Sequence, residues 1–121
     1  MKILLCVMLF PLMAALQLSA APLPGQTLIS GSDATLQRDV LADLFTAEKA
    51  LSGGCKKSRV VDTRITQPPK TIGQERGTGL AVAQWTERWT IDRCGKNVFY
   101  TIHFDSRGSA GTMFKIQAPL K

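Results

Sequence analysis

Glu87, Arg88 and His103 are residue types that a phosphodiester-cleaving enzyme could use. A carboxylate base, an imidazole acid and a guanidinium that binds phosphate would together support general acid–base catalysis. In an extended strand, however, successive side chains point to opposite faces of the sheet. The alternation around these residues puts Glu87 on the face opposite to His103. The sequence therefore favours a protein that is not an enzyme, with a small secreted ribonuclease-like hydrolase as the alternative.

Other catalytic and metal-binding arrangements are not indicated by the sequence. His103 is the single histidine, so it is the one ordinary base that could activate a serine or cysteine nucleophile. One histidine and the pair Cys55 and Cys94 cannot complete a tetrahedral metal shell. We therefore expect no cofactor, no metal and no catalytic residue.

The first 20 residues are typical of a secretory signal. Met1 and Lys2 give a positive start, residues 3–16 are an apolar run that contains Cys6, and Leu18-Ser19-Ala20 resembles a cleavage site. The run is too short to span a bilayer comfortably. We predict a signal peptide at 1–20 and a periplasmic or secreted product with no transmembrane segment after cleavage; a retained anchor is the alternative.

Cys55 and Cys94 are the cysteines that remain after such a cleavage. An even pair in a small exported domain predicts a disulfide. The bond would close a loop of about 40 residues, which in the chain-entropy model stabilises the fold by roughly 4 kcal/mol.

Residues 81–117 predict three consecutive antiparallel strands. Apolar side chains occupy odd positions up to Ile91 and even positions from Val98 onward, so both sets fall on one face. A two-residue type II′ turn at Gly95-Lys96 would pair Trp89 with Ile102 and Arg88 with His103. In that register Glu87 faces Phe104, and a three-residue loop, Ser106-Arg107-Gly108, pairs Tyr100 with Phe114. We expect both tryptophans to belong to the core, with a stacking platform as the alternative.

The segment before these strands predicts one amphipathic helix. Ser32 or Asp33 is the expected N-cap, and Gly53-Gly54 the expected end. Its apolar face comprises Leu36, Val40, Leu41, Leu44, Phe45 and Leu51, and Glu48 is expected mostly off that face with the other charged residues. Residues 58–66 predict a first strand. Residues 21–31 are expected to be a flexible leader, and residues 67–79 a mobile loop or a long crossover.

These elements define the fold class that we predict. It is a single α+β domain over residues 32–121, in which one N-terminal helix packs on an antiparallel sheet of about four strands with one disulfide. Glu87 falls on the apolar face of this sheet. It is then either a structural carboxylate with a hydrogen-bonding partner, or a tuned functional acid.

The water-facing side of the sheet is the candidate binding surface. Without Lys2 the chain has 14 basic and 9 acidic side chains, a net charge of +5. This charge favours an anionic ligand, or an envelope or secreted protein, as partner, and nucleic acid is disfavoured. An ordinary solvated face is the alternative. The candidate binding residues are Arg88, Phe99, Thr101, His103 and Lys115.

The hairpin also carries a resemblance. Residues 87–95 read Glu-Arg-Trp-Thr-Ile-Asp-Arg-Cys-Gly, and residues 111–114 read Gly-Thr-Met-Phe. This resembles small exported proteins of Gram-negative bacteria that share a Glu-x-Trp-x-Val-x-x-Cys-Gly core and a closing Gly-Gly-Thr-x-Phe. Here Ile91 replaces the valine and Ala110 the first glycine. The resemblance covers about a quarter of the chain and implies export and a similar fold. That group has no assigned activity, so no catalytic residue carries over.

Overall fold

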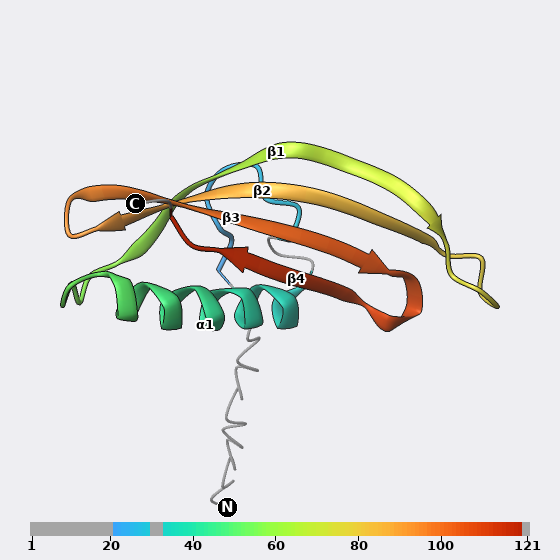
Figure 1. The fold of residues 1–121 in the computed structure, drawn as a ribbon, viewed down its shortest axis with the longest axis horizontal. Helices are drawn as coiled ribbons and strands as arrows, with labels where there is room; N and C mark the ends of the chain where they lie inside the picture. Colours follow the sequence, from blue (N-terminus) through green and yellow to red (C-terminus); the bar gives the residue numbers. More distant parts are fainter. Residues whose placement is uncertain (1–20, 30–32, 120–121) are drawn as a thin grey trace, which may run out of the picture.

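The computed structural model describes residues 21–29 and 33–119. Helix α1 (Ala34–Leu51) is followed by strands β1 (Arg59–Gln74), β2 (Ala81–Arg93), β3 (Lys96–Arg107) and β4 (Thr112–Gln117), with a short turn η1 (Gly108–Ala110) before β4. The strands form one antiparallel sheet in the order β1-β2-β3-β4, and α1 lies across one of its faces (Figure 1). One helix on a four-stranded antiparallel sheet confirms the predicted architecture. The predicted signal at 1–20 lies outside the described residues.

Helix α1 begins and ends close to the predicted positions. The Asp33 side chain accepts a hydrogen bond of 2.9 Å from the amide of Leu36, as an N-cap residue should. After Ser52 the chain turns through Gly53 and Gly54, both of which have a positive φ. The side chains that α1 buries most fully include Val40 and Leu44, at a spacing of one helical turn. This apolar stripe fixes the side of α1 that faces the sheet.

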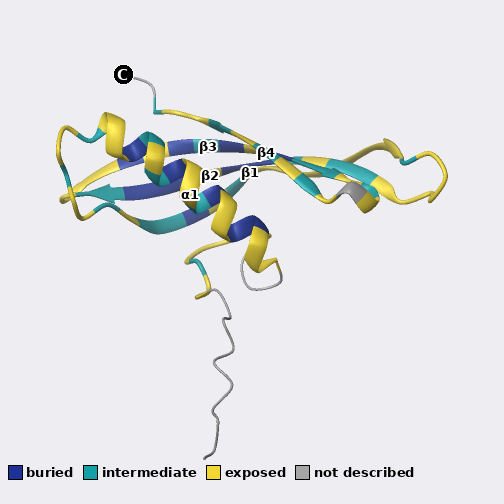
Figure 2. Cartoon of the chain, turned by 90° about the horizontal axis from the view of Figure 1, so that it is seen from below, coloured by how far each residue is buried: buried dark blue, intermediate teal, exposed yellow. Residues whose placement is uncertain are grey.

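The core lies between α1 and the central strands. Trp89 and Ile91 of β2 and Tyr100 and Ile102 of β3 are fully buried on the face that α1 covers. The prediction of one shared apolar face is therefore confirmed. Burial is concentrated where α1 crosses the sheet and declines along the arm formed by the far ends of β1 and β2 (Figure 2).

The predicted β2–β3 register was wrong by two positions. The turn is Cys94-Gly95, and φ is 49° at Cys94 and 89° at Gly95, which suits a type I′ turn. Trp89 therefore pairs with Tyr100, not with Ile102. A shift of two leaves every side chain on its predicted face because the side-chain period of a strand is also two.

The predicted β3–β4 pairing was also wrong. Phe114 lies opposite Phe104, not Tyr100, because the connection from Arg107 to Gly111 is longer than the predicted three-residue loop and contains η1. The connection still has an odd number of residues. The even-numbered apolar residues of β4, Phe114 and Ile116, therefore lie on the inner face as expected.

The predicted mobile loop at 67–79 is mostly strand. β1 continues to Gln74 and pairs with β2 as far as Ala81, which leaves residues 75–80 as the connection. Register shifts on both sides of Gln67 take up Pro68 and Pro69 without ending the pairing. Proline suggested a loop from the sequence, but irregular positions at a sheet edge accept it.

Residues 21–29 of the expected flexible leader form hydrogen bonds with β1, while residues 30–31 lie outside the described residues. The amide of Gln26 donates to the carbonyl of Thr63 at 2.8 Å, and the amide of Thr27 donates to Thr63 Oγ1 at 2.9 Å. Ile29 is 2% exposed and joins the core. This segment packs along β1, so it is part of the domain.

The predicted disulfide is confirmed. Cys55 and Cys94 are bonded, with a Cα–Cα distance of 6.0 Å. The bond ties the connection between α1 and β1 to the β2–β3 turn. Helix and hairpin are thereby held together at one end of the molecule.

Candidate functional site

The sheet face turned away from α1 is called the outer face. Among its residues Arg88, Phe99, His103 and Lys115 are exposed and Thr101 is half-buried. All five predicted binding residues therefore lie on this face, because Arg88 pairs with Thr101 and His103 with Lys115 in the ladder. The predicted neighbour of Arg88 was His103, and this pairing was wrong. His103 lies opposite Thr86.

The acidic residues of the outer face are each paired with an arginine on the same face. Asp62 lies 2.9 Å from Arg64, Asp105 lies 2.9 Å from Arg107, and Asp92 lies 3.7 Å from Arg59, measured between nitrogen and oxygen. Lys70, Arg88 and Lys115 have no ion pair with any described residue. The outer face therefore carries cations whose charge is not neutralised within the described chain.

Arg88 also contacts an exposed aromatic ring. Its guanidinium carbon lies 5.1 Å from the centre of the Phe99 ring, which is within the range of a cation–π contact. The Phe99 residue is 49% exposed. This pair presents an apolar surface and a fixed positive charge side by side.

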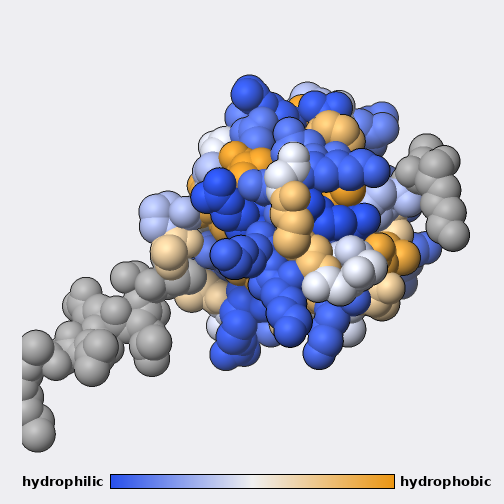
Figure 3. All heavy atoms as spheres, turned by 90° about the vertical axis from the view of Figure 1, so that its left-hand side faces the viewer, coloured by the Kyte–Doolittle hydropathy of each residue, from blue (hydrophilic) through white to orange (hydrophobic). Residues whose placement is uncertain are grey.

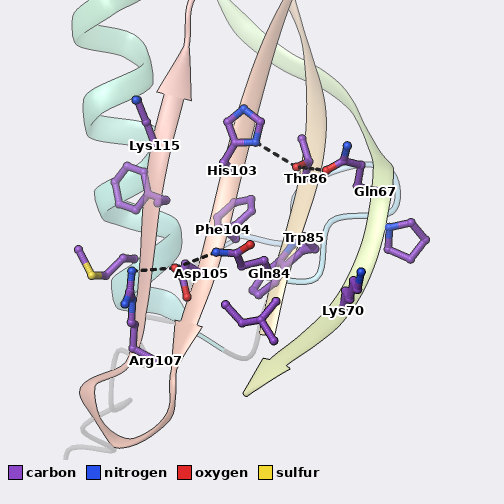
Figure 4. A pocket seen from close by; sticks show the side chains of 14 residues that line it. Gln67, Lys70, Gln84, Trp85, Thr86, His103, Phe104, Asp105, Arg107 and Lys115 are labelled. Atoms are coloured by element: carbon purple, nitrogen blue, oxygen red, sulfur yellow. Dashed lines mark hydrogen bonds and ion pairs between the residues drawn. The ribbon is translucent and has the colours of Figure 1, made fainter. Parts of the chain in front are cut away.

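A hydrogen-bonded chain crosses the outer face from β1 to β3. Thr86 Oγ1 donates to Gln67 Oε1 at 3.1 Å and lies 3.0 Å from His103 Nδ1 (Figure 4). The Thr86 hydroxyl has one proton, which it donates to Gln67, and the direction of its contact with His103 Nδ1 depends on the imidazole tautomer. His103 Nε2 has no described partner and faces the same side of the sheet as Lys115.

Two hollows divide the predicted site. His103 and Lys115 line a hollow of about 680 Å³ on the outer face, together with Lys70 and the ion-paired Asp105 (Figure 4). Phe99 and Thr101 line a different hollow, of about 790 Å³, at the free end of β3. The structure thus places the predicted residues on one face but not in one pocket.

Glu87 is fully buried on the opposite face from His103. Its carboxylate accepts hydrogen bonds from the Leu28 amide at 2.8 Å, the Thr27 hydroxyl at 3.0 Å and Trp89 Nε1 at 3.2 Å. These donors bring residues 21–29 onto the sheet, which is the structural role considered for this residue. Glu87 cannot share a substrate with His103 from this position.

Glu48 was expected off the apolar face of α1, and this was wrong. It is 1% exposed and accepts two hydrogen bonds from Arg93, of 2.6 Å to Nε and 2.8 Å to Nη2. The hydroxyls of Ser58 and Tyr100 also donate to it. The spacing from Val40 through Leu44 to Glu48 is one helical turn at each step. That signal in the sequence could have placed Glu48 toward the core.

The Glu48 cluster also changes how its members titrate. The Arg93 guanidinium holds the pKa of the Glu48 carboxyl below its ordinary value, against the opposing effect of burial. Burial and the hydrogen bond to Glu48 raise the pKa of Tyr100 to about 12. The same carboxylate raises the pKa of the Arg93 guanidinium above its ordinary value. The cluster is therefore an ion pair with a neutral phenol over the ordinary pH range.

Trp89 lies in the core as predicted. Trp85 is half-buried, with its ring stacked on Phe104 at 4.9 Å between centroids and 13° between planes. Both rings belong to the inner side of the sheet. The stacking platform considered for Trp85 is therefore occupied by a ring of the chain itself.

Within 21–29 and 33–119, no three acidic, cysteine or histidine side chains gather as metal ligands. In the same ranges, no helix has the length and apolar character needed to cross a membrane. Comparison with known proteins found no matching family model, no similar curated protein and no similar solved structure.

Proposed function

We propose that the protein is a periplasmic or secreted binding protein, without enzymatic activity, whose outer face binds an anionic partner. The observation that carries this proposal is the presence of Lys70, Arg88 and Lys115 without acidic partners among the described residues, on a face where each acid is paired. Unpaired cations on a rigid sheet attract and orient anionic groups at little cost in reorganisation.

Two independent features support the proposed compartment. The disulfide between Cys55 and Cys94 is of a kind that persists in oxidising compartments. The signal predicted at 1–20 would direct the chain there. A small, cross-linked domain with one binding face suits an inhibitor, an immunity protein or an accessory protein of the envelope.

The test compares two triple variants with the same charge change on the same face. One replaces Lys70, Arg88 and Lys115 by Gln, and the matched control replaces the ion-paired Arg59, Arg64 and Arg107 by Gln. On immobilised heparin, we expect the first variant to elute at a clearly lower salt concentration than the control. Equal elution, or no retention of the parent protein, would contradict the proposal. Capture of a partner from an envelope extract should then depend on the first set of residues.

One observation favours the alternative, a phosphodiester hydrolase. His103 Nε2 has no described partner and lies on the cationic face beside Lys115. Against it, Asp105 is engaged by Arg107 and Glu87 lies on the other face. We therefore expect only background cleavage of RNA by both the parent protein and His103→Ala. A real activity that is lost in the variant would establish the hydrolase.

A further inference from the structure

We propose that the free edge of β3, residues 96–100, binds an extended acidic segment of a partner protein as an added strand. This edge adjoins the outer face at Phe99, whose ring Arg88 contacts, whereas Lys70 and Lys115 line a different hollow. The edge does not depend on Lys70 or Lys115, so the inference stands whether or not the outer face binds an anion. It is carried by the ladder geometry, the groove beside the edge and the charges there.

The backbone of this edge is available for pairing. β4 pairs with β3 only from Ser106 back to Thr101. Ala118 and Pro119, which follow β4, line the same groove as residues 96–99, but no described residue outside β2 forms a backbone hydrogen bond with residues 96–100. The Arg107 amide donates to the Gly111 carbonyl at 2.8 Å, away from β2. The β2–β3 register has no break. Because ladder bonds alternate along a strand, Asn97 and Phe99 must also direct their N–H and C=O groups away from β2.

The opposite edge of the sheet is protected. Along β1, the main chain of Gln26 bonds to Thr63, and its side chain accepts from the amide of Ile65 at 3.2 Å. Further along β1, the edge is interrupted by Pro68, Pro69 and the register shifts beside them. These are the usual protections against unwanted strand pairing. Residues 96–100 have neither a proline nor a bulge, and Lys96 is their one charged side chain.

Contacts for the side chains of an added strand are present on both sides of this edge. The groove of about 790 Å³ is lined by Val98 and Leu51 on the side of α1 and by Phe99 on the outer side. Leu51 is 44% exposed and Phe99 is 49% exposed. Successive side chains of a bound strand would point alternately to these two apolar groups, which is how added strands are selected.

The edge is held in place before any partner arrives. Tyr100 at one end donates to Glu48, and Cys94, two residues before Lys96, is bonded to Cys55. A preordered edge binds with a smaller loss of conformational entropy.

The charges around the groove favour an acidic occupant. Arg93 and Lys96 line it and no acidic side chain does. Arg93 is neutralised by Glu48, and Lys96 has no ion pair with a described residue. The surface at this end of the molecule is mostly hydrophilic, with separate hydrophobic spots (Figure 3). A second copy is disfavoured because it would bring two chains of positive net charge, each with a Lys96, edge to edge.

The test uses amide hydrogen exchange of the full chain with a peptide of four Glu-Val repeats. At a free peptide concentration of 100 times its Kd, hydrogen exchange at the Asn97 and Phe99 amides should slow by up to about 100-fold. A peptide of four Lys-Val repeats should leave both amides unchanged. Binding of the acidic peptide without protection of these amides, equal protection by both peptides, or no binding would overturn the proposal.

Matched variants locate the peptide. Asn97→Pro removes the outward N–H, whereas Asn97→Ala keeps it, so we expect a loss of affinity of about tenfold for the proline variant alone. If Asn97→Pro fails to fold, Lys96→Glu should weaken binding and Lys57→Glu should not.

The double variant Lys70→Gln/Lys115→Gln separates the two proposals, because it keeps Arg88 in contact with Phe99. It should retain peptide binding, and a loss as large as that of Asn97→Pro would move the peptide to the outer face and overturn the edge site. Without peptide, protection of the Asn97 and Phe99 amides that rises with protein concentration, together with a measured dimer mass, would assign the edge to a second copy of the chain. This result would also overturn the proposal.

Discussion

The hydroxyl of Tyr100 on β3 lies 2.5 Å from Glu48 Oε2 on α1, inside the core. Arg93 at the end of β2 bonds both oxygens of the same carboxylate, and Ser58, which precedes β1, donates to it as well. The helix is thus joined to three parts of the sheet region through one buried side chain. A bidentate arginine and two hydroxyls satisfy the charge that burial would otherwise penalise.

Replacement of Glu48 by Gln should destabilise the fold strongly. It leaves the Arg93 guanidinium, which is largely buried, without its counterion, and breaking a buried pair costs about 3–5 kcal/mol. The measurement is the free energy of unfolding in urea. Asp43→Asn, at an exposed position of α1, serves as control and should change it little. A loss below 1 kcal/mol for Glu48→Gln would contradict this role.

The same cluster predicts a dependence of stability on pH. Arg93 lowers the pKa of Glu48 in the folded state, so the folded protein holds this proton less tightly than the unfolded chain does. The stabilisation is present above the unfolded pKa of about 4.3 and is lost as the pH falls through the lower folded pKa. Urea unfolding from pH 6 down to pH 2 should show this loss. In the variant Glu48→Gln, this contribution to the slope should be absent.

Replacement of Glu87 by Gln should loosen residues 21–29. Its oxygens accept from the Leu28 amide and the Thr27 hydroxyl, and an amide offers only one oxygen for these donors and for Trp89. We expect a loss of roughly 1–3 kcal/mol in unfolding free energy and faster hydrogen exchange at the Leu28 amide. Glu75→Gln is the control, because Glu75 bonds Ser109 in another part of the molecule. An unchanged exchange rate at Leu28 would rule out the anchoring role.

Gly25 should not tolerate a side chain. Its φ is +87°, and a Cβ there would lie 2.3 Å from the carbonyl oxygen of Thr63. The variant Gly25→Ala should therefore push residues 21–29 off β1 and lower the melting temperature. Gly53→Ala is the matched control, with φ at +64° and no atom within 4 Å of the added carbon. Both substitutions put a side chain on a residue with positive φ, so both introduce backbone strain. Equal melting temperatures would therefore show that the clash with Thr63 does not affect stability.

Removal of the disulfide should cost a large part of the stability. The double variant Cys55→Ser/Cys94→Ser is expected to lose about 2–5 kcal/mol in unfolding free energy, as is usual when a native disulfide is removed from a small domain. Reduction of the parent protein should give a similar loss. If oxidised and reduced proteins unfold at the same urea concentration, the bond has no role in stability.

Local patterns in the sequence predicted the elements that local physics decides. The alternation around Trp89 and Tyr100, the Asp33 cap and the one-turn spacing of Val40 and Leu44 each depend on neighbours close in the chain. The side chains of β2 and β3 were assigned to the correct faces despite the error in register. The face of a strand residue depends only on whether its position is odd or even, and a shift of two does not change that.

Contacts between distant residues decided the remainder. Pro68 and Pro69 lie within β1 because β2 continues beside them, and residues 21–29 are ordered because Glu87 and Thr63 offer partners far along the chain. Glu48 is buried because Arg93 and Tyr100 meet it from two strands.

The sequence by itself determined one helix, the central hairpin, the disulfide and the side of the sheet on which each candidate residue lies. Only the tertiary structure decided the register, the length of β1, the buried ion pair and the free edge of β3. The physical reason is that side-chain periodicity is a local property, whereas hydrogen-bond partners and counterions come from segments that only folding brings together.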